Sequence, residues 1–235
     1  MKDEVPQPDR PGVTLQLGRT TLRGASAVAV MLLVVAGVVA LVVWRAPHLR
    51  FTPLVASGLL WFAFIVYWSI AAADTARAKR SESRGSRALH QNLLNLGLLL
   101  LFLRLPGLEP RWVPAGPWPV ACGFALQVAC GLLAVWARRH LGRNWSGEIT
   151  RKEGHELVTT GPYRKLRHPI YTAILGMYFG TAVISGELHG LLAFAIVGFA
   201  YARRIPLEEA ALRAEFGDRW HAYRATSWAL IPGVY

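Results

Sequence analysis

The stretch WPVACGFALQVACGLLAVWA, residues 118–137, carries no charged side chain and is long enough to cross a lipid bilayer as a helix. The apolar residues come in blocks and not at amphipathic spacing, which is typical of segments that face lipid. The sequence therefore predicts an all-α integral membrane protein, a polytopic bundle of about six transmembrane helices. The other apolar runs lie at residues 25–44, 53–73, 89–105, 170–185 and 188–202, the last two being the shortest.

The composition also favours a membrane location. Of the 235 residues, 53% are hydrophobic and 17% are charged, whereas ordinary soluble domains carry about 25% charged residues. The net charge of +12 comes from Lys and Arg between the apolar runs, so anionic membrane lipids are the expected partners and nucleic acid is not. Cys122 and Cys130 share one apolar run, which predicts two buried thiols and neither a disulfide framework nor a metal site.

The distribution of Lys and Arg predicts the orientation of the chain. Positive charge is concentrated in the N-terminal segment, in the loop after residue 73 and in the loop after residue 137, and one topology makes all three regions cytoplasmic. Six spans then place both termini in the cytoplasm, in a multi-pass protein of the inner or plasma membrane. Trp118 and Trp136 lie at the two ends of one predicted span, as in an aromatic belt.

The chain divides into three predicted parts. Residues 1–24 form a polar N-terminal tail, and residues 25–137 hold four transmembrane helices. Residues 138–235 form a core that has a cytoplasmic loop, a helical hairpin at 170–202 and a C-terminal cytoplasmic helix pair. In that pair, Pro206 suits the start of the first helix, Gly217 ends it and Asp218 caps the second.

The residues able to do chemistry lie mainly outside the apolar runs. The runs carry few polar residues, among them Gln127, whereas ionisable and aromatic residues gather at 138–171 and 203–235. A transporter or channel places ionisable residues within its spans. The pattern therefore favours an enzyme that works at the cytoplasmic interface over a conduit.

Two groups of residues stand out in these regions. Pro169 suits the first turn of a helix, and the unpaired backbone N–H groups there, with Arg167 and His168, predict a site for an anionic group. The alternative is that the basic residues only set the topology and touch anionic lipid. Glu208 and Glu209 follow a proline, and the positive end of a helix dipole is itself sufficient to explain both acids.

Two separated motifs carry a resemblance to a known family. The run HELVTTGPYRKLRHPIY at residues 155–171, followed after an apolar hairpin by EEAALRAEFGDRWHAY at 208–223, resembles the isoprenylcysteine carboxyl methyltransferase family and its phospholipid N-methyltransferase relatives. The upstream LGRNWSGEIT at 141–150 is similar to bacterial-type members of that family. The first three apolar runs show no motif.

The resemblance implies a membrane methyltransferase that takes S-adenosylmethionine as methyl donor and a lipophilic, isoprenylcysteine-carboxylate-like substrate from the bilayer. It implies catalytic roles for Arg167, which would orient an anionic group, and for Glu208. The family motif continues RHPxYxG, and Ala173 takes the glycine position here, which narrows a close backbone approach to ligand. The substrate entrance would be lined by Arg143, Asn144 and Trp145. The cofactor-binding positions would be His155, Leu157, Gly161, Tyr163, His168, Pro169, Tyr171 and Glu209.

The implied chemistry suits these residues, because a carboxylate is ionised at neutral pH and attacks a sulfonium methyl group without a base or a metal. Phospholipid or small-thiol methyltransferases remain alternatives, in which Glu208, Glu209 or His168 removes a proton from the acceptor. The C-terminal pattern, with Trp220, Tyr223 and the closing residues 231–235, also resembles the tail of membrane sterol reductases that use a nicotinamide cofactor such as NADPH. A non-enzymatic membrane protein that binds anionic lipid through its basic loops is the last alternative.

Overall fold

The computed structural model describes residues 14–17, 20–23, 52–72, 79–80, 83–103, 105–142, 145, 150–151 and 156–234. It contains two compact units, one of Met1–Phe51 with Phe62–Thr75 and one of Thr52–Trp61 with Ala76–Tyr235. In the first unit, strand β1 (Thr14–Leu17) pairs antiparallel with β2 (Thr20–Arg23), so the predicted polar tail contains a hairpin. The apolar run predicted at residues 25–44 lies outside the described residues.

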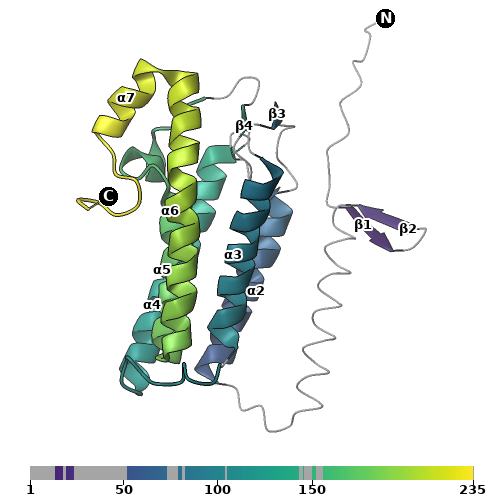
Figure 1. Cartoon of the computed structure of the whole chain (residues 1–235), viewed down its shortest axis with the longest axis vertical. Coiled ribbons are helices and arrows are strands. Elements are labelled where there is room, and N and C mark those ends of the chain that lie inside the picture. The colour runs from purple at the N-terminus through teal and green to yellow at the C-terminus, as the bar shows by residue number, and fades with distance from the viewer. Residues whose placement is uncertain are drawn as a thin grey trace, which may run out of the picture. The chain divides into compact units, whose positions relative to one another are not determined.

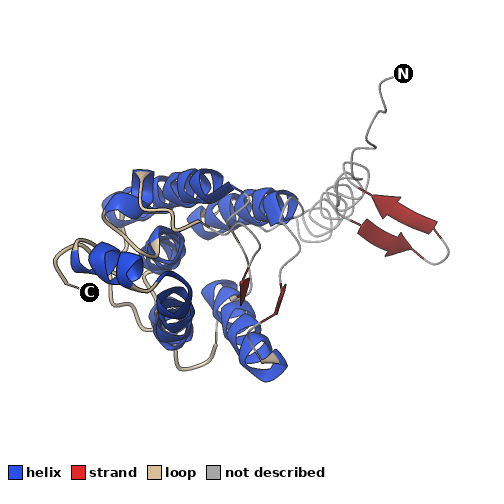
Figure 2. Cartoon of the chain, turned by 90° about the horizontal axis from the view of Figure 1, so that it is seen from above, coloured by secondary structure: helices blue, strands red, loops and turns tan. Residues whose placement is uncertain are grey.

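Helices make up most of the second unit. α3, α4, α5 and α6 run side by side, and α7 lies at one end of α6 (Figure 1). A 3-10 helix, η2, precedes α5. Viewed from above, strand is limited to short pieces in the described part of the chain (Figure 2), which confirms the predicted helical fold class. The bounds are α2 Pro53–Ala72 (which continues into the first unit), β3 Lys79–Arg80, α3 Arg84–Phe102, α4 Pro117–Leu141, β4 Thr150–Arg151, η2 Gly161–Arg164, α5 Pro169–Ser185, α6 Leu188–Phe216 and α7 Asp218–Ala225.

Small residues let α4 and α5 approach each other closely. Gly176 and Gly180 lie one turn apart on α5, and a methyl group added at Gly180 would be 2.7 Å from the carbonyl oxygen of Gly123 on α4. Such small-xxx-small pairs are a common way for membrane helices to pack. Cys130 packs against Gly176 in this contact and is partly buried. The prediction of two buried thiols is wrong for Cys122, which is exposed because it lies on the outward face of α4.

A polar cluster inside the bundle is fully hydrogen-bonded. The Ser57 hydroxyl on α2 donates to the side-chain oxygen of Gln127 on α4 at 2.9 Å and lies 3.1 Å from the hydroxyl of Thr181 on α5. The Trp61 indole also donates to Thr181, at 2.9 Å, and the Gln127 amide donates to the Ser57 carbonyl. Polar groups in an apolar medium must be paired in this way. Gln127, a polar residue in the apolar run at 118–137, therefore links α4 to α2.

α6 is longer than its predicted apolar run and continues through Pro206 to Phe216. The predicted helix pair is therefore wrong in its first member, because Pro206 lies inside α6. A proline inside a helix removes one backbone hydrogen bond. Arg204 and Ile205 just before it are buried in the bundle, and Arg204 pairs with Glu208 on the other side of the proline. Gly217, with φ +53°, ends α6 as predicted, and Asp218 is the first residue of α7 and not its cap.

Three helices are long and apolar enough to cross a membrane by length and composition, namely Pro53–Ala71, Pro117–Leu141 and Leu188–Phe216. α5 is apolar but has only 17 residues. α3 begins at Arg84 and carries several amides, which lower its hydropathy. The prediction of helices able to cross a bilayer is thus confirmed. The described residues contain fewer such helices than the six predicted spans.

Candidate active site

The turn before α5 is built on a glycine. Gly161 has φ +58°, a left-handed conformation that glycine adopts without strain, and opens η2 together with Pro162. A side chain at this position would also meet the ring of His140, the nearest atom lying 2.7 Å from an added methyl group. The His140 ring is held by Thr160, with 2.8 Å between Nε2 and Oγ1, and stacks on Tyr163. The turn at Gly161 and Pro162 therefore places Tyr163 against the last turn of α4.

Residues 226–230, here called the C-terminal strap, pair with the segment that leads into α5. The backbone N–H groups of Arg167 and His168 donate to the carbonyl oxygens of Trp228 and Ala229 at 2.7 and 3.0 Å. The Trp228 N–H donates in return to the Lys165 carbonyl at 3.0 Å. The N–H groups of Arg167 and His168 are therefore occupied by backbone and do not contribute to the open anion site that the sequence predicts here.

Arg167 is partly buried and paired with a carboxylate. Its Nε donates to Oε1 of Glu209 at 2.7 Å, and its Nη1 donates to the carbonyl oxygens of Ser227 and Arg224. The guanidinium thus joins α6 to the strap. Arg224 itself is 60% exposed and has its Nε 3.7 Å from the other oxygen of Glu209, so a second cation lies on the solvent side of this carboxylate.

His168 lies between the two glutamates. Its Nε2 is 3.3 Å from Oε1 of Glu209, and its Nδ1 is 3.6 Å from Oε2 of Glu208. The imidazole is buried, with 6% of the side chain exposed, whereas the Glu208 and Glu209 side chains are 20% and 14% exposed. The two carboxylates are therefore the parts of this group that a ligand can still reach.

Arg204 balances the charge of Glu208. Its Nε donates to Oε1 of Glu208 at 2.9 Å and to the phenol oxygen of Tyr171 at 3.2 Å, and the Tyr171 hydroxyl donates to the same Glu208 oxygen at 2.5 Å. Arg204 lies outside both sequence motifs. An Arg–Glu pair four residues apart is a helix signal, but it is visible only if α6 continues through Pro206. We call Arg167, His168, Arg204, Glu208 and Glu209 the ionic cluster.

Aromatic rings surround the ionic cluster. The Tyr171 ring lies parallel to that of His168, with centroids 5.4 Å apart, and stacks on Tyr201 with centroids 4.2 Å apart.

The Tyr163 hydroxyl is buried and has no hydrogen-bond partner among the described residues, and burial raises its pKa. The Tyr223 hydroxyl donates to the Tyr163 carbonyl at 2.6 Å, and burial raises the pKa of Tyr223 to about 12, so it stays a protonated donor at neutral pH.

The predicted site residues separate into three groups. Leu157 precedes η2 and is partly buried, and the Trp145 ring lies 4.3 Å from the Arg138 guanidinium at the end of α4. Arg143, Asn144 and His155 lie outside the described residues. The structure brings together Gly161, Tyr163, Arg167, His168, Pro169, Tyr171, Glu208 and Glu209 in and around η2, the first turn of α5 and the far part of α6.

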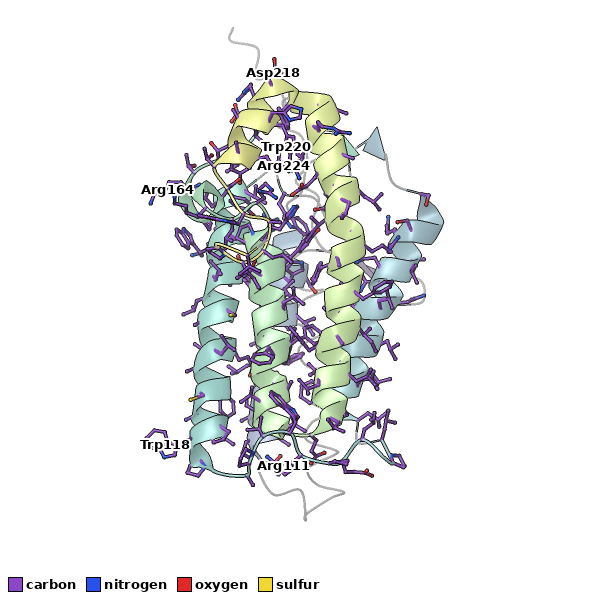
Figure 3. All side chains as sticks on the ribbon, turned by 60° about the vertical axis from the view of Figure 1, so that its left-hand side comes forward. Arg111, Trp118, Arg164, Asp218, Trp220 and Arg224 are labelled. Carbon is purple, nitrogen blue, oxygen red and sulfur yellow. The ribbon has the colours of Figure 1, made fainter. Side chains whose placement is uncertain are left out.

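The site lies at one end of the bundle. Arg164, Trp220 and Arg224 gather there, opposite the end that carries Arg111 and Trp118 (Figure 3). Carboxylates accept hydrogen bonds from hydroxyl and ammonium groups, and the faces of aromatic rings attract cations. Together with the Tyr163 hydroxyl, which is unpaired among the described residues, these groups suit a ligand that carries hydroxyl groups and positive charge. The described residues contain no group of three or more His, Cys, Asp or Glu side chains with the geometry of a metal site.

Comparisons with known proteins agree with the two motifs. The family model for phospholipid methyltransferases matches residues 118–219. Protein-S-isoprenylcysteine O-methyltransferase B of Arabidopsis thaliana is 34% identical over 132 residues, which cover 55% of this chain and 64% of that protein. Protein-S-isoprenylcysteine O-methyltransferase A of the same plant is 31% identical over 150 residues, which cover 63% of this chain and 74% of that protein.

A solved structure is weakly similar to this chain. It is that of a eukaryotic intramembrane Ras methyltransferase, isoprenylcysteine carboxyl methyltransferase, with 17% sequence identity and a TM-score of 0.49, covering 79% of this chain and 70% of that one. The match to protein B spans slightly less than two thirds of that relative, and the match to protein A spans more. On the strength of the sequence match to protein A, the chain belongs to the isoprenylcysteine carboxyl methyltransferase family.

Proposed function

We propose that the chain is an integral membrane methyltransferase that uses S-adenosylmethionine to methylate the carboxylate of a lipophilic, isoprenylcysteine-like substrate. The observation that carries the proposal is the ionic cluster, in which residues of both family motifs meet at one end of an apolar bundle. Family membership supports the same reaction class. When bound, S-adenosylmethionine supplies a methyl group on a positively charged sulfur.

The residues of the cluster have distinct proposed roles. Glu209 and Glu208 accept hydrogen bonds from the cofactor, and the Tyr163 hydroxyl, which is buried and unpaired among the described residues, donates to it. The stacked rings of His168 and Tyr171 form an aromatic wall of the same pocket, suited to a cation. We infer from these roles that residues 138–235 are the catalytic core.

The acceptor carboxylate requires alignment more than activation. It is already ionised at neutral pH, so the protein contributes orientation and the removal of water. Arg167 holds Glu209 and the C-terminal strap in place, and the exposed Arg224 presents positive charge toward the solvent side of the site. A lipophilic carboxylate that arrives from the membrane surface meets these two cations.

The position of α4 supports a site at the membrane surface. Trp118 and Trp136 are 79% and 54% exposed. They are separated by about 27 Å along the helix at 1.5 Å per residue, close to the ~30 Å thickness of the hydrocarbon core. Arg138, Arg139 and His140 follow Trp136 after one alanine, so this end is the cytoplasmic one by the distribution of positive charge. We place both termini on that side, in a multi-pass protein.

Ligand binding tests the cofactor assignment. We would titrate the protein in lipid nanodiscs with S-adenosylmethionine, S-adenosylhomocysteine and NADPH, and follow its thermal midpoint and binding heat. Both adenosyl compounds should stabilise the protein, by about 2.7 kcal/mol at a hundred times the dissociation constant. His168→Ala and Glu209→Gln should abolish that shift, while Arg213→Ala, on the exposed side of α6, should keep it. Stabilisation by NADPH alone would indicate a reductase. If none of the three compounds raised the thermal midpoint, a non-enzymatic role would be favoured.

A second candidate function is N-methylation of a phospholipid amine. The match of residues 118–219 to the phospholipid methyltransferase model favours it. An amine must lose a proton, and Glu208, Glu209 or His168 lie in the site to accept one. Labelled methyl transfer to a farnesylated cysteine, to phosphatidylethanolamine and to an alkyl thiol separates these acceptors. Only a methyl ester releases its label as methanol in mild base, so that release identifies the carboxylate reaction.

A further inference from the structure

α3 packs along α6 (Figure 1), although it lies outside residues 118–219, which the family model matches. In its first turn, the hydroxyl and the carbonyl oxygen of Ser86 accept hydrogen bonds from Arg203 at 3.1 and 2.8 Å. One turn further along α3, the His90 ring meets that of Tyr201 edge-on, with centroids 5.5 Å apart and planes at 61°. The start of α3 is therefore fixed to the part of α6 that leads into the ionic cluster.

Four rings, here called the aromatic row, connect α3 with the site. They are His90, Tyr201, Tyr171 and His168, in that order. Tyr201 stacks on Tyr171 with centroids 4.2 Å apart, and Tyr171 lies 5.4 Å from His168 with only 2° between the planes. His90 and Tyr201 are buried, with 8% and 1% of their surface exposed. Because buried side chains are closely packed, the position of each ring limits that of the next.

We propose that His90 is a positioning residue for the aromatic wall of the cofactor pocket, an inference that rests on the proposed function. The edge of its ring holds Tyr201 in the orientation in which Tyr201 stacks on Tyr171. The stack in turn keeps Tyr171 parallel to His168, the pair to which we assign the wall. In this role His90 acts on the cofactor through Tyr201, and α3 becomes part of the support of the active site.

The charge of the methyl donor gives this role a signature. S-adenosylmethionine carries a positive sulfur and S-adenosylhomocysteine a neutral one, and the faces of aromatic rings attract cations. His90→Leu keeps an apolar side chain and removes the ring edge. It should weaken binding of S-adenosylmethionine by about two- to tenfold, the worth of one aromatic pair, and that of S-adenosylhomocysteine less. His90→Phe keeps a ring edge and should bind both compounds as the wild type does.

Gly97 provides the matched control for a role in helix packing alone. It lies about two turns after His90 on α3, and a methyl group added there would clash with the Val197 side chain on α6. Gly97→Ala therefore disturbs the same contact between helices without touching the aromatic row. It should lower the thermal midpoint and leave the ratio of the two affinities unchanged.

The experiment is a double-mutant cycle measured by calorimetry in nanodiscs, with thermal midpoints recorded for every variant. Dissociation constants for both compounds are determined for the wild type, His90→Leu, His90→Phe, Tyr201→Leu, the His90→Leu/Tyr201→Leu pair and Gly97→Ala. If His90 acts through Tyr201, the loss of its ring adds little in the Tyr201→Leu background. His90→Gln, which also lacks a ring, takes the place of His90→Leu if that variant does not fold.

Several outcomes overturn this inference and leave the proposed function standing. They are a folded His90→Leu that binds S-adenosylmethionine as the wild type does, a His90→Phe that binds as weakly as His90→Leu, and a loss that adds in full to that of Tyr201→Leu. An affinity ratio that shifts equally in Gly97→Ala and His90→Leu would assign the effect to helix packing and overturn it too. Failure of the wild type to bind either compound would instead overturn the proposed function.

Discussion

The phenol oxygen of Tyr171 lies 2.5 Å from Oε1 of Glu208, although the two residues are 37 positions apart and belong to different helices. Tyr171 closes the first family motif and Glu208 opens the second, so this hydrogen bond joins the two motifs directly. The intervening hairpin of α5 and α6 thus brings the two motifs into contact at one end of the bundle.

Removal of this hydroxyl tests the junction. In Tyr171→Phe, Glu208 keeps the hydrogen bond from Arg204 and loses the one from Tyr171, while the ring stack on His168 remains. We expect stability to fall by about 1 kcal/mol and the affinity for S-adenosylhomocysteine to fall several-fold. The matched control is Tyr178→Phe on the same helix, whose hydroxyl donates to the Leu94 carbonyl at 3.0 Å outside the site. It should lower the thermal midpoint and leave the affinity unchanged.

Substitution of Gly161 tests the turn before α5. Gly161→Ala places a methyl group against the His140 ring in a left-handed conformation, and it should destabilise the protein by about 1–2 kcal/mol or more. Gly217 has a similar φ of +53°, and a methyl group added there meets no atom within 4 Å. Gly217→Ala therefore measures the cost of the backbone strain without a steric clash. Both variants should have a lower thermal midpoint than the wild type, and only Gly161→Ala should weaken cofactor binding. Adding His140→Ala should restore part of that loss.

The C-terminal strap should matter through its backbone. Trp228→Pro removes the N–H that donates to the Lys165 carbonyl, whereas Trp228→Ala removes the side chain and keeps that N–H. Because the Arg167 guanidinium also binds a strap carbonyl, at Ser227, detachment of the strap loosens the pairing of Arg167 with Glu209. We expect binding of S-adenosylhomocysteine to be weaker in Trp228→Pro than in Trp228→Ala, measured by calorimetry. Equal affinities in the two variants would mean that the Trp228 indole, and not the backbone pairing of the strap, supports the site.

The helices could be predicted from sequence because each apolar run is a local property of the chain. The run at 118–137 lies within α4, and the turn between the last two runs falls at Gly186, whose φ of +65° a glycine tolerates. The continuation of α6 through Pro206 could not be predicted, because Pro206 resembles a helix start when read locally. In the structure, Arg204 and Ile205 just before it are buried within one continuous helix.

The site could be predicted only where the motifs name its residues. Arg204 lies outside both motifs, and its partnership with Tyr171 spans 33 positions. The strap pairs Arg167 with Trp228 through backbone atoms, which leave no pattern of side chains in the sequence. Contacts of this kind follow from how the hairpin folds back, and no local rule of composition or periodicity contains them.

The pH dependence of stability tests the burial of Tyr223. Its pKa rises from the ordinary value of 10 to about 12, mainly through burial, with Glu209 adding to the rise and Arg167 opposing it. A folded pKa above the unfolded one means that the folded state holds the proton more tightly. The resulting stabilisation, about 2–3 kcal/mol, is then complete below pH 10 and is lost as the pH rises toward 12.

Comparison with Tyr223→Phe isolates this residue from the other tyrosines. The phenylalanine cannot titrate, and it also lacks the hydrogen bond to the Tyr163 carbonyl. The wild type should therefore melt at a higher temperature than the variant by a constant margin between pH 7 and pH 10, and that margin should shrink between pH 10 and pH 12. A margin that stays constant up to pH 12 would show that the Tyr223 phenol ionises no differently in the folded and unfolded chains, and that its hydroxyl is open to water and not held against η2.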